Sequence, residues 1–187
     1  MTLLLLGLVL WWASHTFPLV ARPRRDAIVA QIGEGPWKGL FALVSLAAIV
    51  LMVIGYQRAA FVEVWTPPGW GVHLNNLLML VAVFLLGASH SKGNVKRFVR
   101  HPQLLSVVVW AVAHLLVNGD VAALVLFGGT GLWAVVAIFA TNARDGVWMK
   151  PAPAPAKKDL ILVGITVVAF AVIAGVHAWI GVSPFPG

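Results

Sequence analysis

The chain has 187 residues, of which 60% are hydrophobic and only 10% are charged, and its mean hydropathy is +0.93. Soluble domains carry roughly 25% charged residues, so this composition indicates a membrane protein. The chain contains no cysteine, which excludes disulfides, iron–sulfur clusters, thiolate metal sites and cysteine nucleophiles. Its net charge is +7, but the basic residues occur in short clusters between apolar segments, so we expect a lipid bilayer and no nucleic acid as partner.

Six apolar segments follow one another along the chain, and we predict that each forms a transmembrane helix. Each is about 17–23 residues long, enough to cross a hydrocarbon core of about 30 Å at about 1.5 Å per residue. The predicted spans are residues 2–20, 38–57, 71–90, 102–118, 120–141 and 159–181. The predicted fold class is therefore all-α, a polytopic membrane bundle of six transmembrane helices, and residues 1–187 form a single domain.

The connections between the spans carry their own signals. Residues 21–37 are predicted to include a short interfacial helix, with Arg24 and Arg25 towards anionic headgroups. In the turn after the fourth span, Gly119 suits the end of one helix and Asp120 the N-cap of the next. The GGTG stretch at 128–131 favours close packing of another helix.

The distribution of positive charge sets the predicted orientation. The first, third and fifth connections carry twelve of the thirteen Lys and Arg residues, and the second carries only Arg58. Basic connections stay in the cytoplasm, so both termini are predicted to lie outside.

Depth divides the six histidines into two groups. His15 and His114 are the two that lie well inside predicted spans, and intramembrane ionisable residues are functional candidates by default. The alternative is that each forms an interhelical hydrogen bond worth about 1 kcal/mol. The other four lie near membrane boundaries, where an interfacial or hydrogen-bonded role is expected: His73, His90, His101 and His177. His101 precedes a proline and is predicted to begin a helix.

The helical face around His114 supports a functional role. At about 100° per residue, Gln103, Ser106, Trp110, His114 and Asn118 all fall within a stripe of about 120°. The rest of the span is Leu, Val and Ala. Such a stripe turns towards the interior of a bundle rather than towards lipid.

The predicted topology allows His15 and His114 to approach one another. Counted along opposite helices, they lie about 3–9 Å apart in depth, and the axial ligands of one metal lie about 4 Å apart. A zinc or di-iron site would lack ligands, because the spans offer no Cys, Asp or Glu at mid-membrane. A haem needs only one or two axial side chains and an apolar slot, so haem b, with His15 and His114 as its iron ligands, is the best chemical fit.

Several motifs resemble the NnrU family of bacterial membrane proteins. They are Arg100-His101-Pro102-Gln103-Leu104-Leu105, Trp110-Ala-x-Ala-His114, Asn118-Gly119-Asp120 and Trp65-Thr66-Pro67-Pro68, and the resemblance covers most of residues 1–140. It implies a multi-pass protein of the bacterial inner membrane, in a family named for an association with nitrite and nitric oxide metabolism.

The same family is similar to the plant and cyanobacterial zeta-carotene isomerase, a membrane enzyme that holds haem b between histidines. Its second ligand matches His114, and its first maps onto His15. The isomerase has a cysteine directly after the tryptophan, where this chain has Ala111. The resemblance therefore implies haem binding, but it does not carry over carotene isomerisation.

Three functions are open from the sequence. The first is a haem b protein with a redox, nitric-oxide-related or isomerase-like role, acting on nitric oxide or a hydrophobic small molecule, with no catalytic residue assigned. The second is a non-enzymatic accessory or assembly factor for respiratory or denitrification complexes, in which the histidines only pack. The third, a proton-coupled transporter, is weaker because no acidic residue lies at mid-membrane.

Overall fold

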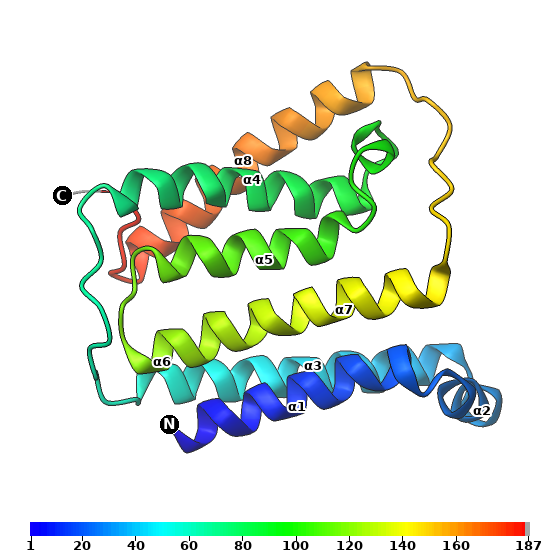
Figure 1. Cartoon of the computed structure of the whole chain (residues 1–187), viewed down its shortest axis with the longest axis horizontal. Helices are drawn as coiled ribbons and strands as arrows, with labels where there is room; N and C mark the ends of the chain where they lie inside the picture. Colours follow the sequence, from blue (N-terminus) through cyan, green and yellow to red (C-terminus); the bar gives the residue numbers. More distant parts are fainter. Residues whose placement is uncertain (186–187) are drawn as a thin grey trace.

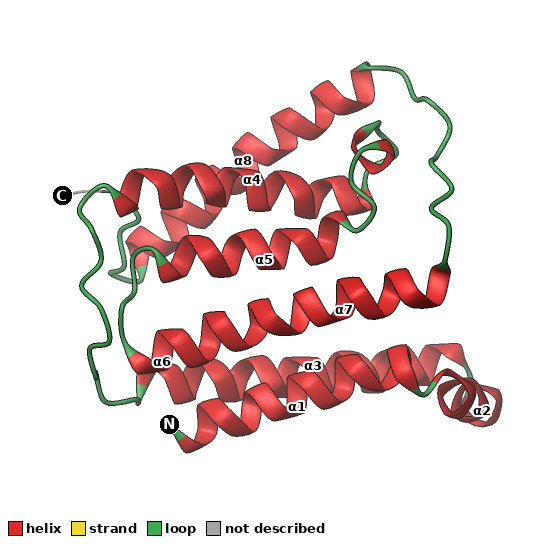
Figure 2. Ribbon diagram, in the orientation of Figure 1, coloured by secondary structure: helices red, strands yellow, loops and turns green. Residues whose placement is uncertain are grey.

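The structure is a computed structural model that describes residues 1–185. Figure 2 shows helices joined by loops, which confirms the predicted all-α class. The elements in chain order are α1 (Thr2–Val20), α2 (Arg22–Ile32), α3 (Glu34–Gln57), α4 (Gly71–His90), the 3₁₀ turn η1 (Val95–Arg97), α5 (Pro102–Leu115), α6 (Val121–Ala123), the π-helical η2 (Leu124–Gly128), α7 (Gly129–Asp145) and α8 (Lys157–Trp179). Within the described residues the extended pairing is a single bridge, between Glu63 and Asp120.

Five of the helical segments are long and apolar enough to cross a membrane: Thr2–Val20, Glu34–Gln57, Gly71–His90, Val121–Asp145 and Lys157–Trp179. The predicted fourth span is shorter than expected, because α5 has 14 residues and ends at Leu115. Beyond it the chain turns, and the Asn118 side chain folds back to donate a hydrogen bond to the His114 carbonyl at 2.9 Å. A helix of this length reaches about 21 Å, so α5 alone is shorter than the hydrocarbon core.

The helices pack in a simple order. α3 contacts α1, α1 contacts α7, α7 contacts α5, α5 contacts α4, and α4 contacts α8 (Figure 1). α7 therefore lies between α1, which carries His15, and α5, which carries His114. This order decides which side chains can form a common site.

Small residues let α7 approach both of its neighbours. A Cβ at Gly129 would press on the Leu8 side chain of α1, and one at Gly131 would lie 2.7 Å from the Ala111 Cβ of α5. The Trp12 indole of α1 donates a hydrogen bond to the Gly129 carbonyl at 3.0 Å. The GGTG stretch thus serves close helix packing, as predicted.

The turn before α6 agrees with the sequence at Asp120 but not at Gly119, because α5 already ends at Leu115, four residues before this glycine. One carboxylate oxygen of Asp120 accepts hydrogen bonds from the backbone N–H groups of Ala122 and Ala123 at 2.9 and 3.0 Å, which confirms the predicted N-cap. The Gly119 carbonyl accepts hydrogen bonds from the backbone of Val64 and Trp65. A side chain at Gly119 would meet the Trp65 carbonyl, so this glycine is needed for the close approach of the 62–65 loop.

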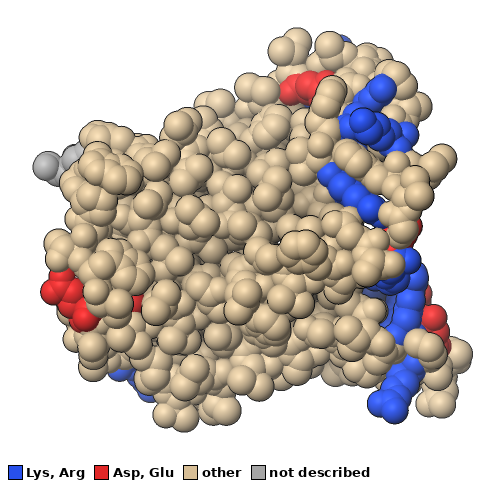
Figure 3. Space-filling model, in the orientation of Figure 1, with Lys and Arg blue, Asp and Glu red and all other residues tan. Residues whose placement is uncertain are grey.

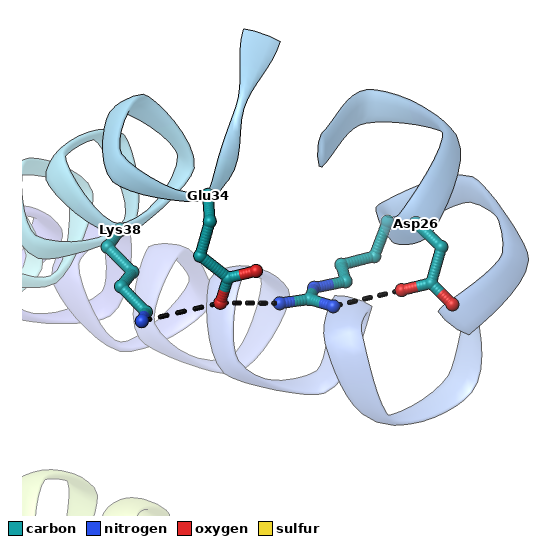
Figure 4. A network of polar contacts seen from close by, with 4 residues as sticks. Asp26, Glu34 and Lys38 are labelled. Carbon is teal, nitrogen blue, oxygen red and sulfur yellow. Dashed lines mark hydrogen bonds and ion pairs between the residues drawn. The ribbon is translucent and has the colours of Figure 1, made fainter. Parts of the chain in front are cut away.

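Lys and Arg side chains gather at one end of the molecule, called here the basic end (Figure 3). The N-terminus and the C-terminal end of α8 lie at the opposite end (Figure 1). α2 lies at the basic end and forms the short helix predicted within residues 21–37. Glu34 of α3 lies 3.3 Å from Lys38 Nζ and 3.5 Å from Arg25 of α2, which also pairs with Asp26 (Figure 4).

Two side-chain tethers position α8. At the basic end the Asp159 carboxylate accepts hydrogen bonds from the Asn94 backbone N–H at 2.7 Å and from its amide Nδ2 at 2.6 Å. At the opposite end Asn76 Nδ2 of α4 donates to the Pro184 carbonyl at 2.9 Å. Only three residues of α8 are buried among the described part of the chain: Leu162, Thr166 and Ala174.

Candidate functional site

His15 lies in a cluster of aromatic rings between α1, α3 and α7. Its imidazole stacks on the Trp11 indole, with ring centroids 3.7 Å apart and an interplanar angle of 21°. Phe41 of α3 and Trp133 of α7 meet the same imidazole edge-on, at 4.9 and 5.3 Å. His15 is therefore enclosed on three sides by packed rings.

His114 lies near the end of α5, against the π-helical segment before α7. Its imidazole stacks on Phe127, with centroids 4.5 Å apart and an angle of 23°, and is tilted by 50° against Trp110. In both cases the tryptophan one turn before the histidine, Trp11 or Trp110, is in contact with its imidazole.

Hydrogen bonding favours the same tautomer in both deep histidines. His114 Nδ1 lies 2.9 Å from the Trp110 carbonyl, which can only accept, so Nδ1–H donates and the neutral ring keeps a lone pair on Nε2. His15 Nδ1 likewise lies 3.1 Å from the Trp11 carbonyl, and the Ser14 hydroxyl donates its own hydrogen to that carbonyl. Nδ1–H of His15 therefore donates as well, and its neutral ring also keeps a lone pair on Nε2.

The structure does not bring His15 and His114 into one site. His15 contacts Trp133 of α7, and His114 contacts Phe127 of η2, the segment that leads into α7; these two rings are six residues apart, which is about 9 Å along a helix. The two imidazoles share no neighbouring ring among the described contacts, and α7 lies between their helices. A single iron between them stays a prediction that requires a rearrangement of this packing.

Two neighbouring cavities open beside His114 instead. Their volumes are about 280 and 250 Å³. Their walls come from α4, α5 and α8, and the larger cavity is also lined by the turn after α5 and by residues 182–184 after α8. Four residues line both cavities: Met79, His114, Ile173 and His177. Sites for small molecules occupy about 300–1,000 Å³, and two adjoining chambers of these sizes together fall in that range.

His177 resembles His114 in its hydrogen bonding. Its Nδ1 lies 2.8 Å from the Ile173 carbonyl four residues earlier, so Nδ1–H donates and Nε2 keeps the lone pair of the neutral ring. No hydrogen bond is made by Nε2 of either histidine within the described residues. The cavities therefore hold two imidazoles, on two different helices, that are each prepared to donate a lone pair.

The larger cavity has a polar end made of amides. Asn75 is 7% exposed, and its Oδ1 is buried without a partner among the described residues. Asn76 and Asn118 line the same cavity, and each uses its amide nitrogen to donate to a backbone carbonyl. A buried unpaired amide oxygen is costly unless water or a ligand donates to it.

The cavity walls fit a haem in part. Two imidazoles with a free Nε2, surrounded by Val, Ile, Met and Phe side chains, supply the axial donors and apolar contact that a haem needs. Among the described residues neither cavity is lined by Lys or Arg, so propionates would meet the remaining amide hydrogens of asparagines rather than cations. The donor set and the apolar walls therefore fit a haem, whereas cationic partners for its propionates do not line the described cavities.

His177 and Asn75 contribute more to the site than their positions in the sequence indicate. His177 was expected to be interfacial, because it lies near the end of its span, but it lines the same cavities as His114. Adjacent asparagines at 75 and 76 inside an otherwise apolar segment were the available signal. By contrast His101 begins α5 as predicted, and its Nε2–H donates to Asn142 Oδ1 at 2.9 Å.

Comparison with known proteins places most of the chain in one family model. The model, described as NnrU protein, matches residues 3–184. No significant match to a curated protein or to a solved structure is found.

Proposed function

Because the chain belongs to the NnrU family, and its helices are apolar enough to lie in a bilayer, we propose that it is a multi-pass protein of the bacterial inner membrane that binds haem b through His114. The observation that carries this proposal is the hydrogen bond from His114 Nδ1–H to the Trp110 carbonyl. It holds the imidazole in the tautomer that ligates iron, beside cavities with apolar walls.

The orientation follows from charge. The basic end lies in the cytoplasm, and the N-terminus and the end of α8 lie outside. The sixth crossing is made by α5 together with its flanking turns, since 14 helical residues are short of the hydrocarbon thickness. His114 then lies towards the outer side of the bilayer.

The protein's own residues would bind and orient the cofactor. Trp110 fixes the ring of His114, Phe127 supports one face of the imidazole, and the apolar side chains of α4 and α8 exclude water. Bound haem would supply a one-electron redox centre, or, when an axial position is open, a place for a small gas such as nitric oxide. Isomerase-like chemistry on a hydrophobic small molecule is the other use consistent with such a site.

An absorption spectrum tests the proposal. The full chain is expressed in haem-replete cells, purified in mild detergent, and measured before and after reduction with dithionite. We expect a Soret band that shifts on reduction and that is lost or strongly weakened in His114→Ala. The matched control is His73→Ala, because His73 lines neither cavity and its loss should leave haem content unchanged.

Two results would overturn the proposal. One is wild-type protein without a Soret band, which would leave the histidines as packing residues and favour the accessory-factor hypothesis. The other is His114→Ala protein that retains full haem content with an unchanged spectrum.

A further inference from the structure

The second histidine of the cavities suggests how the site is completed. α5 and α8 make no extensive contact with each other, since α4 packs against both. His114 and His177 nevertheless line the same two cavities from these two helices. Imidazoles carried by separate helices can flank a flat ligand, whereas imidazoles on one helix face cannot.

We propose that His177 is the second imidazole of this site, so that haem b is held between His114 of α5 and His177 of α8. This inference rests on the proposed function and deepens it. It replaces His15, the partner predicted from the sequence, by a histidine that shares the cavities of His114.

The tautomer of His177 suits it to this role. Nδ1 of His177 has a backbone carbonyl as its partner, at 2.8 Å, which leaves Nε2 free to bind iron. Nδ1 of His15 also has a backbone carbonyl as its partner, at 3.1 Å, so the choice of His177 over His15 rests on the shared cavities and on packing.

Packing supports it too. The His15 imidazole lies 3.7 Å from the Trp11 indole and is bordered by Phe41 and Trp133, so a cofactor would have to displace a stacked aromatic cluster. His177 belongs to a helix with few buried residues, tethered at its two ends. Small shifts of α8 can therefore adjust the distance between His177 and His114 without disturbing the tightly packed α1–α7–α5 contacts.

The spin state of the iron tests the inference. Two imidazole ligands give six-coordinate, low-spin haem, and removal of one gives a high-spin spectrum. The protein is compared as wild type, His177→Gly and His15→Gly, which are matched substitutions of a helical histidine. We expect wild type and His15→Gly to be low-spin by absorption and electron paramagnetic resonance, and His177→Gly to be high-spin.

Chemical rescue supplies a second measurement. The cavity vacated in His177→Gly should accept free imidazole, and the low-spin spectrum should return as imidazole is added. If His177→Gly is purified without haem, the same rescue is attempted by reconstitution with haemin and imidazole, and recovery of a low-spin spectrum supports the inference.

The failures of the two proposals are distinguishable. A low-spin His177→Gly protein, or no rescue by imidazole, overturns the assignment of His177 while leaving haem binding intact. A low-spin state lost in His15→Gly but kept in His177→Gly would restore His15 as the ligand. Wild-type protein without haem overturns the proposed function itself.

Discussion

Gly131 of α7 lies directly against Ala111 of α5, so closely that a Cβ on the glycine would be 2.7 Å from the Cβ of the alanine. Ala111 is 3% exposed and belongs to a buried cluster with Ala123 and Phe127. Phe127 in turn stacks on His114. The contact between these two small residues therefore sets how closely the helix of His114 approaches α7.

Gly131→Ala is expected to push α5 away from α7. Overpacking of a close contact costs about 1–3 kcal/mol, which outweighs the gain in helix propensity of about 1 kcal/mol from Gly to Ala. The measurement is thermal unfolding in detergent, followed by circular dichroism. The matched control is Gly164→Ala on α8, where the added Cβ has no described atom within 4 Å apart from its chain neighbours and the backbone of its own helix. Equal stability of the two variants would contradict the close packing of α5 and α7.

The Asp120 side chain is expected to stabilise the start of the long α6–α7 rod. Asp120→Ala removes the two hydrogen bonds to the backbone N–H groups of Ala122 and Ala123, and loss of an N-cap costs about 0.5–2 kcal/mol. Asp120→Asn keeps an oxygen that can accept the same bonds and should lose much less. Unfolding midpoints of the two variants provide the check, and similar losses in both would mean that the carboxylate charge matters rather than the cap.

His15 is expected to act as a packing residue at the junction of α1, α3 and α7. His15→Ala removes the stack on Trp11 and the edge contacts with Phe41 and Trp133, and aromatic pairs contribute about 0.5–1.5 kcal/mol beyond their buried area. His15→Phe keeps an aromatic ring and should recover part of the lost stability. Stability and haem content are measured on the same samples, and loss of haem from both variants would show that His15 serves as a ligand.

Local features of the fold could be read from the sequence because they depend on neighbouring residues. Runs of apolar residues placed the long helices, and the bounds of α1 and α4 match the predicted spans 2–20 and 71–90. Asp120 was recognised as an N-cap, because a short acceptor before a helical run has a local partner. The helix α5 ends at Leu115, earlier than the predicted span 102–118, because the apolar sequence continues past the residue where the backbone turns.

The arrangement of the site could not be read in the same way. Counting residues along helices gives the depth of His15 and His114 in the bilayer, but it carries no information on lateral order. The packing order places α7 between their helices. For the same reason His177 was classed by its depth alone, and its position beside His114 follows only from how α5, α4 and α8 pack.

The unpaired amide oxygen of Asn75 makes a prediction about the cavity without its cofactor. The Asn75 side chain is a buried acceptor that has no partner among the described residues. Asn75→Leu puts an apolar side chain of similar size in its place. Removing such a group recovers a desolvation cost of about 1–3 kcal/mol, so haem-depleted Asn75→Leu should be more stable than the haem-depleted wild type. The matched control is Asn118→Leu, which lines the same cavity but loses a hydrogen bond to the His114 carbonyl and should be less stable. Unfolding is followed in detergent after growth under iron limitation. A loss of stability in Asn75→Leu would show that its Oδ1 already has a donor, such as a cavity water, in the absence of haem.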